Sequence, residues 1–201
     1  MFVIPILPLR TQSITNVYIK KLFSDEQCDK IIASANPDAW QDGAVGGHGG
    51  VGKLAIVSSA RSVSEQYLPI QGDGFPLNQI LFEISRLNAF GWCFDLTGFV
   101  SDDMPYLMRY AAERGDHYDW HIDVGYNKNA SRKVGFSIQL SRSEDYQGGD
   151  LEFMKVDLSQ SDRRQRGALI AFPAFRAHRV LPLTRGPRYV IVGWLHGPAF
   201  R

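Results

Sequence analysis

The sequence reads Tyr-Asp-Trp-His-Ile-Asp-Val-Gly at positions 118–125, with Gly115 a few residues before it. If this segment is extended, side chains two residues apart project from the same face. His121 and Asp123 would then point to one place while Ile122 faces away. An imidazole and a carboxylate are two of the three protein ligands that a non-haem iron requires. The pair alone is a weak motif, so a third ligand is needed.

A third candidate ligand, His178, lies in the segment 172–182, and Arg188 follows it in the next apolar segment. Two histidines and one carboxylate on one face of a metal favour Fe(II) oxygenase chemistry. Arg188 precedes the apolar run 189–192, and a buried arginine there needs an anion. Its guanidinium could bind a dicarboxylate through two parallel hydrogen bonds.

In this order the residues resemble the Fe(II)/2-oxoglutarate dioxygenases, and among them the prolyl 4-hydroxylase branch. The likeness covers residues 104–197, whereas the first hundred residues match only loosely. Three blocks carry it: Tyr110 with Gly115-x-x-Tyr118-x-x-His121-x-Asp123; Tyr146-x-Gly148-Gly149-x-Leu151-x-Phe153; and His178-x-Val180-x-Pro182-x-Thr184-x-Gly186-x-Arg188 with Trp194.

The second half of the chain consists of short apolar stretches separated by turns. They predict strands at 105–112, 117–123, 132–141, 149–156, 167–172, 177–182 and 187–196. Strands at this spacing without intervening helices predict an α+β, mostly β fold built on an antiparallel double-stranded β-helix, or jelly roll. Such a fold gathers residues that are distant in sequence around one open mouth.

The first half predicts supporting helices. Ser24 can cap a helix that runs to about Ala35, and a second helix begins at Pro76 and carries apolar residues at helical spacing as far as Phe90. Between them the glycine-rich segment 42–53 is either a flexible connector or a lid over the site.

We expect one dioxygenase domain over residues 1–201. Residues 1–103 would supply the helical support and the lid-like loop, and residues 104–197 the jelly-roll catalytic core. A length of 201 residues with 44% hydrophobic and 21% charged residues is typical of such a globular domain.

The net charge argues against nucleic-acid and membrane partners, and the cysteines favour a reduced compartment. A net charge of +1 provides no long-range field to attract nucleic acid or an anionic membrane, so neither is expected as a partner. Cys28 and Cys93 cannot form a disulfide framework, which favours a reduced, cytoplasmic location. Met1–Leu9 is apolar but too short to span a bilayer, and we expect an arm packed on the core.

The resemblance also implies the cofactors. His121, Asp123 and His178 would bind Fe(II), and 2-oxoglutarate and dioxygen would complete its coordination. Arg188 would pair with the far carboxylate of 2-oxoglutarate. Tyr110, expected on the strand next to that of His121, would donate a hydrogen bond to the same molecule. Ascorbate is a further candidate cofactor. The catalytic set is therefore His121, Asp123, His178 and Arg188.

Gln139 departs from the branch, which often carries an apolar or aromatic residue on this inner strand face. The strand register predicts that Ser137 and Gln139 point inward. Gln139 is therefore a candidate contact of 2-oxoglutarate or of the substrate, unless it only lines the sheet.

Other charged residues have less specific interpretations. His117 is expected to be exposed or hydrogen-bonded away from the metal, and the basic run 163–166 to be a solvated turn. Arg176 and Arg179 flank the third ligand and could line the mouth, which would favour an anionic substrate.

The predicted reaction decarboxylates 2-oxoglutarate to succinate and hydroxylates an unactivated C–H bond. The resemblance favours a prolyl residue in a peptide or protein as substrate, with a free amino acid or small metabolite as the alternative. Two other classes stay open: a non-oxygenase, cupin-like metal-binding protein that uses the same three ligands, and a non-catalytic interaction domain.

Overall fold

The computed structural model describes residues 14–46, 54–55 and 57–200. The predicted packing of Met1–Leu9 lies outside this part of the chain, and so do residues 47–53 of the predicted lid at 42–53. The two ends of the glycine-rich segment pair with each other, as strands β3 (Val45–Gly46) and β4 (Leu54–Ala55).

Two antiparallel sheets form the body of the fold. The larger has seven strands, in the order β1 (Tyr18–Lys21), β12 (Ala168–Pro173), β9 (Arg132–Gln139), β15 (Pro187–His196), β7 (Tyr106–Ala111), β6 (Ser64–Tyr67) and β2 (Gln41–Asp42). The smaller has four, in the order β11 (Leu151–Phe153), β13 (His178–Val180), β8 (His117–His121) and β5 (Arg61–Ser62). A two-stranded ladder joins β10 (Gln147–Gly148) to β14 (Leu183–Arg185).

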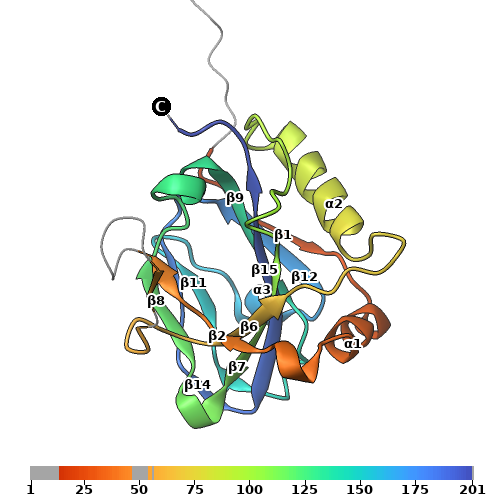
Figure 1. Ribbon diagram of the computed structural model, residues 1–201, viewed down its shortest axis with the longest axis vertical. Coiled ribbons are helices and arrows are strands. Elements are labelled where there is room, and N and C mark those ends of the chain that lie inside the picture. The colour runs from red at the N-terminus through yellow and green to blue at the C-terminus, as the bar shows by residue number, and fades with distance from the viewer. Residues whose placement is uncertain (1–13, 47–53, 56, 201) are drawn as a thin grey trace, which may run out of the picture.

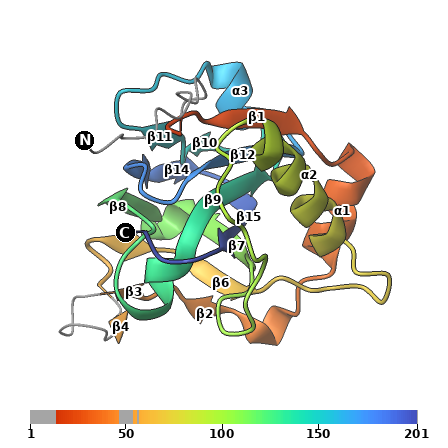
Figure 2. The ribbon, with the colours of Figure 1, turned by 90° about the horizontal axis from the view of Figure 1, so that it is seen from above.

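The seven-stranded sheet separates two apolar clusters. Figures 1 and 2 show α1 and α2 on one side of this sheet, with β8 and β11 on the other. Leu107, Ile138 and Ile191 point to the helix side, where they are fully buried. Tyr110, Phe172 and other inward side chains form the second cluster, which includes Phe153 and Val180 of the four-stranded sheet. This arrangement confirms the predicted mostly β jelly roll with supporting helices.

Both predicted helices are present. They are α1 (Asp25–Ala33) and α2 (Leu77–Phe90); α3 (Gln160–Arg164) and three 3₁₀ turns, η1 (Pro37–Ala39), η2 (Ala112–Arg114) and η3 (Asn127–Ser131), complete the helical elements. The Ser24 hydroxyl accepts a hydrogen bond from the Gln27 amide at 3.2 Å, and the Gln27 side chain accepts one from the Ser24 amide. This reciprocal capping box fixes where α1 begins.

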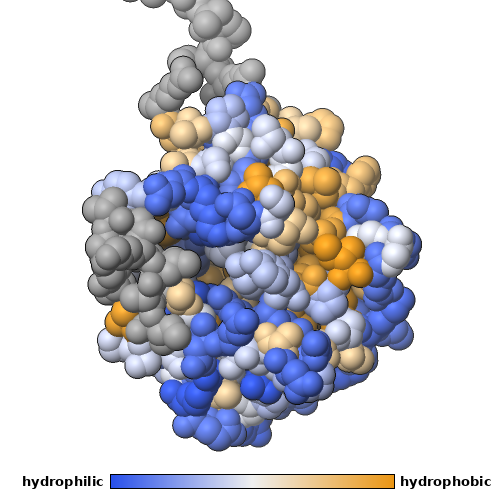
Figure 3. Space-filling view, in the orientation of Figure 1, coloured by the Kyte–Doolittle hydropathy of each residue, from blue (hydrophilic) through white to orange (hydrophobic). Residues whose placement is uncertain are grey.

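Helix α2 packs by one face only. Ile80 and Ile84 are completely buried against the sheet, whereas Phe82 and Phe90 on the opposite face are exposed. In Figure 3 apolar residues gather on the side of the molecule where α2 lies. The alternation of buried and exposed positions is the periodicity from which the helix was predicted.

The first half of the chain also contributes strands, which differs from the purely helical support that the sequence suggested. Strand β1 pairs with β12, and β6 pairs with β7, so both extend the seven-stranded sheet. These strands satisfy backbone groups that would otherwise be exposed at the sheet edges. At four residues each they are too short for a clear alternating pattern.

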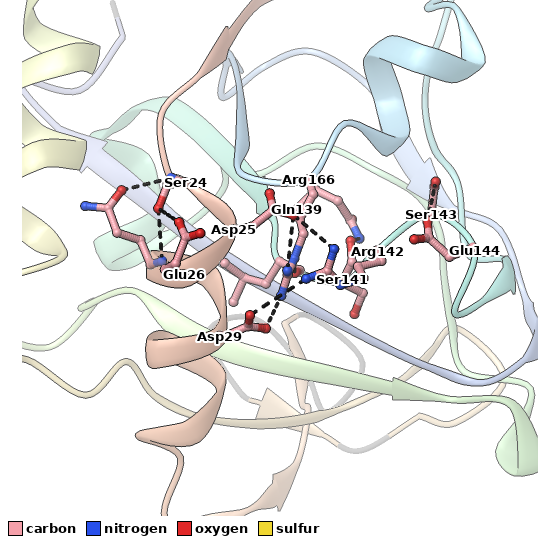
Figure 4. A network of polar contacts seen from close by, with 12 residues as sticks. Ser24, Asp25, Glu26, Asp29, Gln139, Ser141, Arg142, Ser143, Glu144 and Arg166 are labelled. Atoms are coloured by element: carbon pink, nitrogen blue, oxygen red, sulfur yellow. Dashed lines mark hydrogen bonds and ion pairs between the residues drawn. The ribbon is translucent and has the colours of Figure 1, made fainter.

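The basic run 163–166 is not a solvated turn, so that prediction is wrong. Arg164 donates to both carboxylate oxygens of Asp150, at 2.7 and 3.0 Å. The buried Arg166 donates to the Leu140 carbonyl at 2.7 Å and bonds to Asp29 of α1, as Figure 4 shows. Arg166 therefore ties α1 to the end of β9.

No helix in the described ranges is long and apolar enough to cross a lipid bilayer. The cytoplasmic location and the single-domain division at residue 103 stay predictions.

Candidate active site

Three potential metal ligands meet on the inner face of the four-stranded sheet. His178 on β13 lies directly opposite His121 on β8. Asp123 follows in a bend just beyond β8, and its carboxylate oxygens lie 3.7 Å from His121 Nε2 and 3.8 Å from His178 Nε2. One ligand atom from each residue lies within 4.8 Å of the others. The predicted trio is thus gathered around one point.

The path of β8 differs from the simple extended strand expected at 117–123. The pairing register shifts between His178, opposite His121, and Val180, opposite Tyr118. Such a bulge changes which face a side chain occupies. Tyr118 and His121 therefore stack, with ring centroids 3.5 Å apart and planes 15° apart. Trp120, between them in sequence, is exposed and carries the guanidinium of Arg179 against its ring.

Backbone carbonyls fix the orientation of both imidazoles. His121 Nδ1 lies 2.7 Å from the Asp119 carbonyl, and His178 Nδ1 lies 2.9 Å from the Arg176 carbonyl. Because a carbonyl only accepts, each Nδ1 carries the proton and each Nε2 presents a lone pair to the centre of the trio. Burial, together with the neighbouring His178, lowers the pKa of His121 to about 4. His121 is therefore neutral near pH 7, as a metal ligand must be.

Asp123 is confined from two sides. Its amide donates to the Ala174 carbonyl at 2.8 Å. Gly135 on β9 lies beneath its carboxylate: a Cβ at position 135 would come within 2.5 Å of Asp123 Oδ2 and 2.7 Å of the Phe172 ring. Two imidazoles and a carboxylate, converging from one side, fit an Fe(II) ion that keeps its remaining positions for other ligands.

Arg188 provides a buried positive charge in the other sheet. It is 3% exposed, and its Nε donates to Gln139 Oε1 at 3.0 Å. Its Nη1 is buried without a hydrogen-bond partner, and no carboxylate among the described residues pairs with it. A buried guanidinium in this state is costly unless an anion binds it. The site therefore fits a ligand with a carboxylate group.

Tyr110 lies beside Arg188 and not beside His121, so the predicted strand neighbour is wrong. Strand β7 belongs to the seven-stranded sheet, where Tyr110 is opposite Arg188 on β15. The Arg188 guanidinium carbon lies 5.4 Å from the Tyr110 ring centroid. Burial raises the pKa of Tyr110, although Arg188 and Arg61 oppose this. The phenol thus stays protonated and able to donate at neutral pH.

Gln139 and Ser137 are both buried on β9, and Gln139 contacts Arg188. The Gln139 amide nitrogen donates to the Ser141 carbonyl at 3.3 Å, which leaves its oxygen turned to the Arg188 guanidinium. Gln139 therefore orients Arg188.

His117 and Arg179 have partners away from the trio. His117 lies with its ring nitrogens 3.0 Å from the Gly115 carbonyl and 3.3 Å from the Ser59 carbonyl. Arg179 forms an ion pair with Glu152 at 2.8 Å, which compensates its charge. The idea that Arg179 favours an anionic substrate loses its support.

Sequence reasoning missed Arg61, a buried residue of β5. Its guanidinium carbon lies 5.1 Å from the Tyr118 ring centroid, and its Nη2 lies 2.5 Å from Glu65. Its Nη1 donates to the Ala44 carbonyl at 2.6 Å, so Arg61 joins the base of the glycine-rich segment to the interior. The only sequence signal was an arginine four residues before a glutamate, which is also typical of an exposed ion pair.

Comparisons with known proteins agree with this geometry. Residues 106–196 match the model of the 2OG-Fe(II) oxygenase superfamily, where 2OG is 2-oxoglutarate. A PKHD-type hydroxylase of Synechococcus sp. (strain CC9902) is 38% identical over 84 residues, which are 42% of this chain and 38% of that protein. The match thus spans well under half the length of this relative.

Solved structures show the same fold at low sequence identity. A Pseudomonas putida prolyl-4-hydroxylase superposes with a TM-score of 0.62 at 19% identity, covering 90% of this chain and 92% of its own. The viral collagen prolyl hydroxylase of Paramecium Bursaria Chlorella virus-1, solved as a 2OG complex, gives 0.64 at 17% identity, covering 90% and 96%. Residues 106–196 thus match the 2OG-Fe(II) oxygenase superfamily, and the fold around them is that of the solved prolyl hydroxylases.

Proposed function

We propose that the protein is an Fe(II)- and 2-oxoglutarate-dependent dioxygenase that hydroxylates a C–H bond of its substrate. The observation that carries the proposal is the pairing of two features across the interior. One is the His121, Asp123 and His178 trio; the other is Arg188, a buried cation without a counter-ion among the described residues. A bare metal-binding protein of the cupin type has no use for such a cation.

The residues of this chain would divide the work as follows. His121, Asp123 and His178 hold the metal, with each Nδ1 proton kept on a backbone carbonyl. Arg188 binds the far carboxylate of 2-oxoglutarate, Gln139 orients the guanidinium, and Tyr110 donates a hydrogen bond to the same cosubstrate. When bound, Fe(II) and 2-oxoglutarate together supply the oxidising chemistry, with succinate and carbon dioxide as by-products.

The surroundings also exclude water from the reacting centre. The Phe172 ring lies 4.6 Å and the Phe153 ring 5.8 Å from the His178 ring, measured between centroids. Asp123 and His178 are buried. An apolar lining of this kind protects a reactive centre from side reactions.

The substrate we propose is a prolyl residue in a peptide or protein. The support is the names and folds of the relatives, which are prolyl hydroxylases or PKHD-type hydroxylases. A free amino acid or a small metabolite is the second candidate, and ascorbate a candidate accessory reductant.

Succinate release under Fe(II) tests the proposal. The purified chain is incubated with 2-oxoglutarate, dioxygen and, in separate reactions, proline-containing peptides, free amino acids or small-molecule extract. We expect succinate formation that depends on Fe(II), and that is lost in His121→Ala. The proposal fails if no succinate forms in any reaction, or if His121→Ala and Arg188→Met both retain full turnover. Metal binding without 2-oxoglutarate consumption would favour the cupin-like alternative.

A further inference from the structure

The segment that carries Asp123 has a support outside the metal trio. Arg132, the first residue of β9, donates from Nη1 to the backbone carbonyl of Asp123 at 3.4 Å. Its guanidinium also lies flat against Trp194, with the central carbon 3.4 Å from the ring centroid. Arg132 therefore contacts the metal-ligand segment at the Asp123 carbonyl, whereas Ala174 binds the Asp123 amide.

Asp103 fixes the direction of the Arg132 guanidinium. Its carboxylate accepts from Arg132 Nε at 2.6 Å and from Nη2 at 2.7 Å. Because the guanidinium is a rigid planar fork, these two bonds leave Nη1 as the group that faces Asp123. A lysine would carry the same charge, but it could not make the two bonds to Asp103 and the bond to the Asp123 carbonyl with one rigid planar group.

The carboxylate of Asp103 is itself held in place. It is 1% exposed, His196 Nε2 lies 3.2 Å away and Lys128 Nζ lies 3.6 Å away. His196 is in turn anchored by Ser131, whose hydroxyl lies 2.8 Å from Nδ1. The contacts from Ser131 to Asp123 are continuous, and the side chains of His196, Asp103 and Arg132 between them are buried.

We propose that Asp103 and Arg132 are positioning residues that set the affinity of the trio for its divalent metal. They act through the Asp123 backbone, holding the bend in which the carboxylate faces His121 and His178. The inference rests on the proposed function, since it assumes that the trio binds a metal. Partners of metal ligands in other proteins change metal affinity by about 10- to 100-fold when they are removed.

Titration with Mn(II), followed by electron paramagnetic resonance, tests this on the full chain. We expect Arg132→Met and Asp103→Asn each to weaken Mn(II) binding about tenfold or more. We also expect the line shape of the bound Mn(II) to change. Arg132→Lys should not restore the affinity, because the fork and not the charge positions the bend. If Arg132→Met does not fold, the Mn(II) affinities of Arg132→Lys and Asp103→Asn decide whether the inference holds.

The matched control is Arg166→Met. Arg166 has the same 9% exposure as Arg132 and also pairs with an aspartate and a backbone carbonyl, but it lies against α1. Its loss should lower the melting temperature and leave Mn(II) affinity within about twofold. The inference is wrong if folded Asp103→Asn and Arg132→Lys bind Mn(II) like the wild type, or if Arg166→Met weakens binding equally. A wild type that binds no Mn(II) would instead overturn the proposed function, and this inference with it.

Discussion

At the scale of single residues, the site depends on one glycine as much as on its charged groups. Gly135 has no side chain, and its backbone packs directly against Asp123 Oδ2 and the Phe172 ring. A Cβ at this position would have no room. Both neighbours are fixed, since Phe172 is buried and Asp123 is held by Ala174. A methyl group at position 135 would therefore have to displace a candidate metal ligand.

We predict that Gly135→Ala weakens Mn(II) binding about tenfold or more, because the carboxylate of Asp123 must move. Equilibrium titration of the folded variant measures this. Gly72→Ala is the control, since no atom of the described part of the chain lies within 4 Å of a Cβ at position 72. Equal affinity in the two variants would show that Gly135 does not constrain the ligand.

The clustering of the three candidate metal ligands could be predicted from the sequence, whereas their neighbours could not. His121, Asp123 and His178 form a motif whose chemistry is specific, and Arg188 stands out as a cation beside an apolar run. The position of Tyr110 depended on which strands pair, and strand order is set by the whole fold. The bulge in β8 likewise has no signature in its own residues.

At the scale of elements, caps and ion pairs decide where the helices begin and how they attach. The capping box at Ser24 was visible in the sequence because its residues are local. The attachment of α1 to β9 through Arg166 was not, because Asp29 and Arg166 are far apart in the chain. Local patterns therefore predicted the helices, and the long-range ion pairs had to be seen in the structure.

We predict that Ser24→Ala lowers the free energy of unfolding by about 1 kcal/mol, since an amide at the start of α1 loses its acceptor. Urea unfolding measures the change. Ser143→Ala is a suitable comparison, because the Ser143 hydroxyl has one hydrogen-bond partner among the described residues, the exposed neighbouring Glu144. If both variants lose the same amount, the cap does not stabilise the fold.

At the scale of the whole molecule, buried charge as well as apolar packing holds the segment before β7 against β9 and β15. Burial alone would raise the pKa of Asp103, but the close contact with His196 and the hydrogen bonds from Arg132 outweigh it and hold that pKa well below its usual range. A carboxyl group with a lowered pKa in the folded state stabilises the fold above its unfolded pKa of about 3.9. This stabilisation is lost as the pH falls below that value.

We predict that Asp103→Asn is less stable than the wild type at pH 7, and that the difference shrinks as the pH falls below about 4. Thermal unfolding of both proteins across this pH range gives the measurement. A stability difference that stays constant with pH would mean that the ionised form of Asp103 contributes nothing.

The central claim is that the histidine–aspartate trio and Arg188 bind the two ends of one metal–cosubstrate complex. Calorimetric titration of the Mn(II)-loaded chain with 2-oxoglutarate, without dioxygen, tests it most directly. Arg188→Met should bind Mn(II) like the wild type, because Arg188 is not a metal ligand. The variant should also fold, because the substitution removes a buried charge that has no counter-ion among the described residues. It should bind 2-oxoglutarate at least about tenfold more weakly, since a charged hydrogen bond is worth about 1.5–3 kcal/mol. His178→Ala should lose the metal. Wild-type 2-oxoglutarate affinity in Arg188→Met, or wild-type Mn(II) affinity in His178→Ala, would contradict the claim.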